Sequence, residues 1–138
     1  MIRKVGLFRI GNSGFAVPLE RLLRIVSDGF SSALPLIPEG MAGILVLDNE
    51  IIPVCDSNRL SAVASGNGLN AAYKILIVTE YGTVALPADM TVGIVAENRC
   101  ERVASSQEDG VSPGSIRFRD NLYQVLHIDA FMMKLIRP

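Results

Sequence analysis

The side chains that could carry acid–base or nucleophilic chemistry are few in this 138-residue chain. His127 is its one histidine, and Asp129 follows two positions later. A general base needs an orienting partner and a nucleophile or substrate proton within hydrogen-bond reach. Cys55 could be drawn as a thiol partner of His127, which keeps a small β-barrel hydrolase or thiol enzyme open as an alternative. No activated-cysteine motif surrounds Cys55, however, and a free cysteine in an apolar run is commonly buried.

The remaining carboxylates and cysteines have a structural explanation that outweighs a catalytic one. Asp56 and Asp89 could form a carboxylate pair, yet aspartates that leave a strand more often accept hydrogen bonds from turn backbone. Cys55 and Cys100 are too few and too far apart for a zinc site, and no C-x-x-C redox motif occurs. Cys100 is expected on an exposed polar link. The sequence therefore predicts no catalytic, cofactor-binding or metal site.

Charge and hydropathy limit the classes of partner. Thirteen Lys and Arg face fourteen Asp and Glu, and 6% of the residues are aromatic. An oligonucleotide-binding barrel, the second alternative, would need a basic face with exposed aromatics, so no nucleic acid partner is expected. The longest apolar stretch, Met41–Leu47, is far shorter than the roughly 20 residues of a membrane helix. The N-terminus does not resemble a signal peptide, so we expect a cytoplasmic protein without direct membrane insertion.

The elements that must position these residues are mainly short strands joined by turns. Glycine, asparagine or aspartate stands at most of these turns and favours two-residue hairpin connections. Regular short spacing of this kind favours an all-β architecture over βαβ units. The four predicted hairpins are Val5–Ile10 with Phe15–Val17, Gly43–Leu47 with Ile51–Cys55, Lys74–Thr79 with Thr83–Leu86, and Ile116–Arg119 with Leu122–Ile128. Two further strands are predicted at Val92–Val95 and Arg102–Ala104.

Inward-facing residues and helices complete the predicted elements. In the fourth hairpin we expect Ile116, Phe118, Leu122 and Val125 to face inward. Pro18 precedes apolar residues at the i, i+3, i+4, i+7 spacing of one or two helical turns, namely Leu19, Leu22, Leu23 and Val26. Two more short helices are predicted at Ser57–Val63 and at Asp129–Ile136, the second with an Asp cap.

The chain also contains a weak internal repeat. Ala16–Glu20 matches Ala85–Asp89 at an offset of 69 residues, and Ile25-Val26 falls on Ile94-Val95 at the same offset. At an offset of 72, Asp48-Asn49 falls on Asp120-Asn121, and Ile44 falls on Ile116. The same order of hairpin, proline, strand and hairpin thus occurs twice. Two such units predict two small β-subdomains that share one core, because stacking arrays need three or more repeats.

In this order of motifs the sequence resembles the CheW-like domain of bacterial chemotaxis coupling proteins. The resemblance runs from Leu7 to about Leu135 and opens with Leu7-Phe8-Arg9-Ile10 and Phe15-Ala16-Val17-Pro18. The most similar block runs from Gly43 through Ile51-Ile52-Pro53-Val54-Cys55-Asp56, which looks like the family segment G-x-x-x-L-R-G-x-x-x-P-V-x-D-L. Leu76-Ile77-Val78, Ala88-Asp89 and a closing Leu126–Phe131 segment follow in the family order.

The resemblance implies a fold and a function. It implies one domain over residues 1–138, built as two intertwined five-stranded β-barrels with short helices, without enzymatic activity or cofactor. It also implies an adaptor that couples chemoreceptors to a CheA-type histidine kinase, at the inner face of the membrane through receptor complexes. The receptor's cytoplasmic tip would lie in the groove between the barrels. The kinase's regulatory domain would pack against the barrel ends.

Two charges depart from the family pattern. Asp48-Asn49 stands where the family usually has Arg-Gly, and Arg24 stands where the family often has an acid. We hypothesise that Arg24 and Asp48 keep an ion pair of reversed polarity that orders the rim of the groove. The candidate partner-binding residues, called the groove rim below, are Arg24, Asp48, Asn49 and Ile94.

Overall fold

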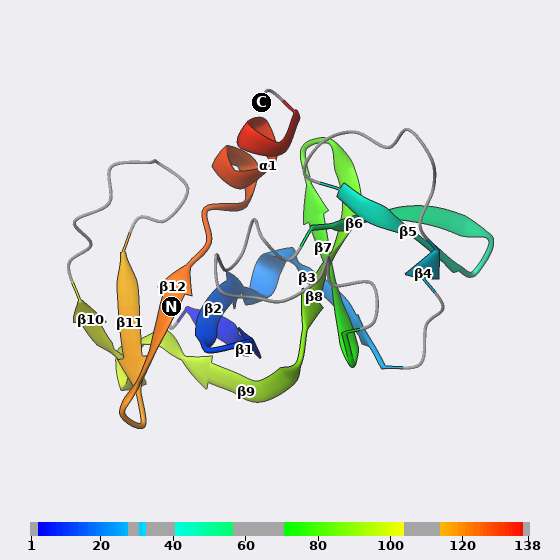
Figure 1. The fold of residues 1–138 in the computed structure, drawn as a ribbon. Coiled ribbons are helices and arrows are strands. Elements are labelled where there is room, and N and C mark those ends of the chain that lie inside the picture. The colour runs from blue at the N-terminus through cyan, green and yellow to red at the C-terminus, as the bar shows by residue number, and fades with distance from the viewer. Residues whose placement is uncertain (1–2, 28–30, 33–40, 57–70, 104–113, 137–138) are drawn as a thin grey trace.

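The computed structural model describes residues 3–27, 31–32, 41–56, 71–103 and 114–136 (Figure 1). Strands dominate this part of the chain, as the sequence predicts, and α1 is its single α-helix. The elements in chain order are β1 (Lys4–Ile10), β2 (Ser13–Pro18), the 3-10 helix η1 (Leu19–Arg21), β3 (Leu22–Val26), β4 (Ser31–Ser32), β5 (Met41–Leu47), β6 (Glu50–Cys55), β7 (Tyr73–Thr79), β8 (Gly82–Ala88), β9 (Met90–Ala96), the 3-10 helix η3 (Glu97–Arg99), β10 (Glu101–Val103), β11 (Ser115–Phe118), β12 (Asn121–Val125) and α1 (Ile128–Ile136).

The strands form two sheets of matching topology. Sheet A has the order β10-β11-β12-β2-β1-β9, and sheet B has the order β4-β5-β6-β8-β7-β3. Each sheet contains one parallel pair, β12 with β2 and β6 with β8, among antiparallel neighbours. The expected all-β fold is therefore confirmed. Each described sheet has six strands and not five, because the short outer strands β4 and β10 extend it.

The four predicted hairpins are present, but the last turn lies one residue earlier than expected. Asp48 and Asn49 form the β5–β6 turn with φ of 51° and 68°, the left-handed values of a type I′ turn. In β11–β12 the same role falls to Arg119 and Asp120, with φ of 50° and 67°, and not to Asp120-Asn121. The two turns are therefore related by an offset of 71 residues, so the expected offset of 72 is wrong by one.

This register also corrects one predicted core residue. Ile116 lies opposite Tyr123, and both side chains are buried. Because successive residues of a strand point to opposite faces, Leu122 must then point outward. Leu122 is 48% exposed. The expectation that it faces inward is wrong, and Tyr123 takes its place.

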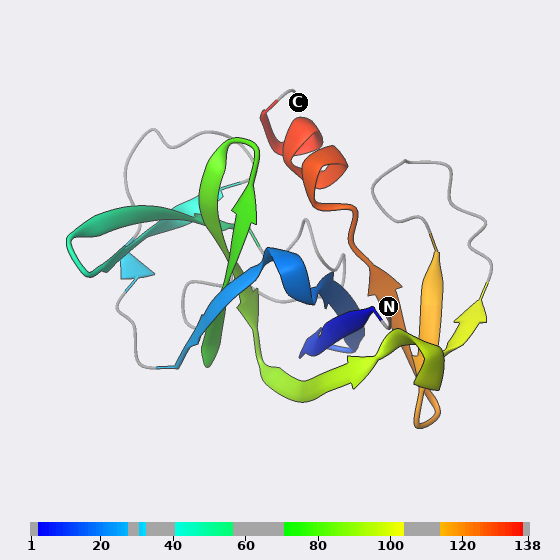
Figure 2. The same ribbon diagram turned by 180° about the vertical axis from the view of Figure 1, so that it is seen from behind.

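The two halves of the chain exchange one hairpin each, since β1–β2 of the first half lies in sheet A and β7–β8 of the second half lies in sheet B. Hairpin β1–β2 corresponds to β7–β8 at an offset of 69, so that Ile10 opposite Ser13 matches Thr79 opposite Gly82. Strand β3 of the first half pairs with β7 of the second, whereas β9 of the second half pairs with β1 of the first. Figure 2 shows β9 carrying the chain from the β7–β8 hairpin to the β1–β2 hairpin. This exchange makes the two sheets intertwined.

Three apolar clusters follow from this arrangement. One lies within sheet B around Leu45, Ile52 and Val54, and a second lies within sheet A around Ile116 and Tyr123. The third and largest lies between the sheets, where side chains of β1–β2 and β7–β8 meet apolar residues of α1. The two sheets therefore share one core between them, and a further small core lies inside each sheet.

The predicted helices are only partly correct. Leu19–Arg21 forms one 3-10 turn, but Leu22–Val26 is strand β3, paired with β7, so the helical prediction for these residues is wrong. The C-terminal helix is present as α1, although it begins at Ile128. The predicted helix at Ser57–Val63 lies outside the described residues. The further strands at Val92–Val95 and Arg102–Ala104 correspond to β9 and β10, with Ala104 outside the described part.

Candidate functional site

The thiol of Cys55 is buried and has low reactivity. Cys55 ends β6 and belongs to the cluster between the sheets, where its side chain has no exposed surface. Burial, with a smaller contribution from the Asp56 carboxylate, raises the pKa of Cys55 from 9.0 to about 12. Only the thiolate is a strong nucleophile, so Cys55 is unreactive near neutral pH. The expected buried cysteine is confirmed, and this geometry argues against the thiol-enzyme alternative.

His127 acts at the start of α1. It lies directly before the helix, is exposed, and its Nδ1 accepts a hydrogen bond from the backbone N–H of Ala130 at 3.2 Å. The first N–H groups of a helix lack partners within the helix, so His127 satisfies one of them. The expected cap at Asp129 is therefore replaced by His127. Asp129 lies in the first turn and instead binds Arg21, with 2.8 Å between Oδ2 and Nη2.

The remaining polar candidates serve turns and strands. The Asp89 carboxylate accepts a hydrogen bond from the backbone N–H of Gly11 at 2.8 Å, so it holds the distant β1–β2 turn. Cys100 is partly buried at the end of η3, so the expectation that it lies on an exposed polar link is only partly correct. Burial and the nearby Glu97 carboxylate raise the pKa of the Cys100 thiol. Within the described ranges, no three His, Cys, Asp or Glu residues come together as a metal site.

The hypothesised ion pair at the groove rim is present. Arg24 lies on the edge strand β3, Asp48 lies in the β5–β6 turn, and 3.1 Å separates Nη1 from Oδ2. The two side chains are 54% and 78% exposed, so the pair contributes little to stability, less than about 1 kcal/mol. Asn49 follows in the same turn. Ile94 lies on β9, the edge strand of the other sheet, where it is 53% exposed.

Exposed apolar residues accompany these charges on the outer strands. On the β5–β6 hairpin, Val46 lies opposite Ile51, and both point outward. The edge strands β3 and β9 expose apolar residues at equivalent positions, which are Leu23 and Val92, and Ile25 and Ile94. Exposed apolar surface next to polar groups is typical of protein–protein contact sites. These faces are therefore candidate docking surfaces.

The comparisons with known proteins agree with this fold. A family model described as the CheW-like domain matches residues 4–134. The chain belongs to the CheW-like domain family. Among solved structures, the scaffolding protein TtCheW from Thermoanaerobacter tengcongensis is similar, with a TM-score of 0.77 and 18% sequence identity over 95% of this chain and 92% of that one. No curated protein matches the sequence. In the described part of this CheW-like domain, no helix is long and apolar enough to cross a membrane.

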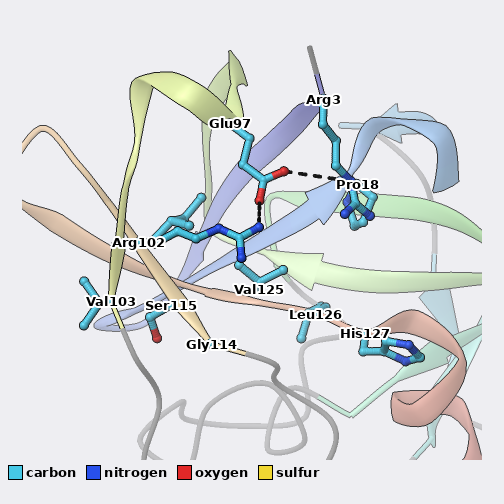
Figure 3. Close-up of a pocket in the computed structure, with 11 residues that line it drawn as sticks. Arg3, Pro18, Glu97, Arg102, Val103, Gly114, Ser115, Val125, Leu126 and His127 are labelled. Atoms are coloured by element: carbon cyan, nitrogen blue, oxygen red, sulfur yellow. Dashed lines mark hydrogen bonds and ion pairs between the residues drawn. The ribbon is translucent and has the colours of Figure 1, made fainter. Parts of the chain in front are cut away.

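This CheW-like domain also contains a cavity that the sequence did not predict. The cavity measures about 620 Å³ and lies between η3–β10 and the end of β12 (Figure 3). The Glu97 carboxylate lies between two guanidinium groups there, 2.8 Å from Arg102 and 3.9 Å from Arg3. Apolar residues, among them Val125 and Leu126, also line the cavity. The cavity could not be predicted from the sequence, because the residues that line it come from segments far apart in the chain.

The aromatic residues that the structure describes do not form a nucleic-acid platform. Single-stranded nucleic acid is bound by exposed aromatic side chains along a basic groove. Among the described aromatics, Tyr81 alone is at least half exposed, whereas Phe8, Phe15, Tyr123 and Phe131 are buried. This distribution argues against the oligonucleotide-binding alternative.

Proposed function

We propose that this CheW-like domain is a non-catalytic adaptor that couples chemoreceptors to a CheA-type histidine kinase in a chemotaxis-like pathway. Its partners would be the cytoplasmic tip of a receptor and the regulatory domain of the kinase. Family membership supports the adaptor role. The observation that carries the proposal is the exposed Arg24–Asp48 pair, flanked by exposed apolar residues on the outer strands. Such surfaces suit recognition and contribute little to folding.

We further propose that the groove rim, made of Arg24, Asp48, Asn49 and Ile94, contacts the receptor tip. Charged groups at the edge of an interface mainly set partner choice, because like charges across an interface repel the wrong partner. The reversed polarity of the Arg24–Asp48 pair would therefore favour a receptor whose charges differ from the usual family pattern. In the cell, the adaptor would lie at the inner face of the membrane through receptor complexes.

Charge reversal tests the role of the rim. Asp48→Arg should weaken binding to a receptor-tip fragment from the same cell by about tenfold, because it places two cations side by side at the rim. Adding Arg24→Glu restores an opposite-charge pair and should return the affinity to near the wild-type value. Titration calorimetry with the purified fragment measures both effects.

Glu20→Arg supplies the matched control for this experiment. Glu20 forms an ion pair with Arg3 at 3.4 Å, both side chains are exposed to a similar degree, and neither residue belongs to the groove rim. This variant should bind the receptor tip like the wild type. Equal affinity of the Asp48→Arg variant, the double variant and the wild type would refute the role of the rim. Absence of wild-type binding to both receptor and kinase fragments would refute the adaptor function itself.

A further inference from the structure

The cavity beside η3 and β10 opens at a position that is fully packed in the other half of the chain. Val125 of β12 pairs with Ala16 of β2, and Val54 of β6 pairs with Ala85 of β8 in the same parallel arrangement. Ala16 and Ala85 are equivalent at the offset of 69 residues, so Val125 and Val54 occupy the same place in the two sheets. Val54 has no exposed surface, whereas Val125 is only partly buried and lines the cavity. The repeated fold therefore does not require this position to be open.

The cavity is large enough for an organic molecule. Its volume is about 620 Å³, and small-molecule sites typically measure roughly 300–1,000 Å³. Protein interiors are close-packed, and voids larger than a water molecule are few. None of the described lining residues is Phe, Tyr or Trp, and the aliphatic ones are Val103, Ile116, Val125 and Leu126. This lining suits an aliphatic chain better than an aromatic ring, which gains from contact with other rings.

The guanidinium groups at the cavity have capacity for a second carboxylate. The Glu97 carboxylate lies between the guanidinium groups of Arg102 and Arg3 (Figure 3). Arg3 also pairs with Glu20, so its charge is shared by two acids. Arg102 has Glu97 as its single acidic partner among the described residues, and this pair uses one nitrogen of the guanidinium. A guanidinium has several N–H donors, so Arg102 can bind a second carboxylate.

The charged and apolar groups of the cavity differ in their access to water. The Arg102 side chain is 80% exposed, whereas Ile116 and Leu126 are buried. Arg102 lies directly opposite Ile116 in the β10–β11 ladder, and both residues line the cavity. A molecule that contacts this guanidinium can therefore reach the apolar lining. Such a molecule keeps its charged end near water and buries its chain.

We propose that this cavity binds a small aliphatic monocarboxylate. Its carboxylate pairs with the Arg102 guanidinium, and its chain lies against Val125 and Leu126. Charge-assisted hydrogen bonds to the arginine orient the molecule, and burial of its CH₂ groups supplies affinity. This binding does not depend on the proposed adaptor function, so the purified 138-residue chain is sufficient to test it.

Titration of the chain with hexanoate and octanoate, followed by methyl NMR, tests the proposal. Octanoate should cause saturable shifts of the Val125 and Leu126 methyl signals, whereas the methyl signals of the equivalent Val54 should stay unchanged. Each added CH₂ group should tighten binding by up to about fourfold, so octanoate should bind roughly tenfold more tightly than hexanoate. Octanol has the same chain without the charge and should bind about tenfold more weakly than octanoate.

Arg102→Gln and Arg117→Gln form a matched pair of variants. Arg117 lies on the neighbouring strand β11, pairs with Glu101 at 3.4 Å and is not among the residues that line the cavity. Both arginines are exposed, so both variants should stay folded. Arg102→Gln should weaken octanoate binding by about tenfold, because it removes the cation that pairs with the carboxylate. Arg117→Gln should keep the affinity within about twofold of the wild type.

The opposite results would each overturn part of the proposal. If millimolar octanoate causes no saturable shift at Val125 and Leu126, or shifts Val54 equally, the cavity is not a specific site. If octanol binds as tightly as octanoate, the cavity takes neutral apolar molecules and the assignment of a carboxylate is wrong. Tighter binding of octylammonium than of octanoate would show that Glu97 recognises the ligand. Equal affinities of Arg102→Gln and Arg117→Gln would contradict the role of Arg102.

Discussion

At the scale of single residues, burial decides which groups of this chain retain chemical reactivity. Cys55 has the residue type of a nucleophile, yet its place between the sheets keeps it protonated. His127 has the residue type of a base, yet its Nδ1 is occupied by a backbone N–H of α1. The exposed Arg24 and Asp48 are left to meet partners. Cys55 and His127, whose residue types could carry catalysis, thus have structural roles, whereas the exposed charged side chains are available for recognition.

The buried thiol makes the stability of the protein depend on pH in the alkaline range. The folded pKa of Cys55 is about 12 and the ordinary value is 9.0, so its contribution is fully present below pH 9. Above pH 9 the unfolded chain loses the proton while the folded protein keeps it. The unfolding free energy should therefore fall by up to about 1.4 kcal/mol per pH unit between pH 9 and 12. Urea denaturation of the wild type and of Cys55→Ala, compared at each pH, isolates this contribution.

Thiol labelling provides the control for this prediction. In the native protein at pH 8, iodoacetamide should modify Cys100, which is partly exposed, and leave Cys55 intact. Both cysteines should react after unfolding. Rapid alkylation of native Cys55, or the same alkaline slope in Cys55→Ala as in the wild type, would contradict the burial argument.

Sequence reasoning succeeded for residues whose role follows from local pattern. The burial of Cys55 follows from the apolar run around it, and the Asp48–Asn49 turn follows from residue types that tolerate positive φ. It failed at Leu122 because the register of β11–β12 depends on the burial of Ile116 and Tyr123 as a pair. The exact position of the β11–β12 turn was not predictable either, because it begins with Arg119, and arginine is not a residue type that marks positive φ.

At the scale of elements, helix α1 joins the two sheets. It continues from β12 of sheet A, and its buried Phe131 and Met132 pack in the cluster between the sheets. Arg21 of η1 binds Asp129 and also donates to the carbonyl of Val78 on sheet B at 3.1 Å. The Asp129 side chain thus fastens a helix that follows sheet A to elements beside sheet B.

Removal of the Arg21–Asp129 pair should destabilise the protein more than removal of a surface pair. The two side chains are 33% and 24% exposed, so their charges are partly shielded from water. Arg21→Gln should lower the unfolding free energy by about 1–2 kcal/mol, because Asp129 loses its charged partner. Glu20→Gln breaks an exposed pair and should cost less than about 0.5 kcal/mol. Urea midpoints provide the comparison, and equal shifts in the two variants would show that the pair does not fasten α1.

The elements that were predicted wrongly are those set by distant partners. Leu19, Leu22, Leu23 and Val26 have helical spacing, but so short an apolar run is compatible with either structure. Pairing of β3 with β7, a strand about fifty residues later in the chain, decides for the strand. The hairpins were predicted correctly, because their partners are adjacent in the sequence and their turn residues are distinctive.

At the scale of the whole molecule, duplication and strand exchange make the two sheets depend on each other. Sheet B contains β3 to β6 from the first half but needs β7 and β8 from the second, and sheet A shows the reverse arrangement. The internal repeat and the family resemblance made this duplicated architecture predictable. The repeat alone did not reveal which strands are exchanged, because the exchange depends on pairings between the halves that leave no local sequence pattern.

Because of this exchange, we expect a packing defect in one sheet to weaken both. Leu45 and Ile116 occupy equivalent positions in the two sheet cores and are fully buried. Leu45→Ala and Ile116→Ala should each lower the unfolding free energy by about 2–5 kcal/mol. Since the sheets share strands and a core, native-state hydrogen exchange should show that the most protected amides of β1 and β7 lose protection by the same amount in both variants.

Val46→Ala, an exposed neighbour of Leu45, should leave protection almost unchanged. If Leu45→Ala instead lowers protection in sheet B while β1 and β2 keep theirs, the sheets unfold separately, and strand exchange does not make the domain a single cooperative unit.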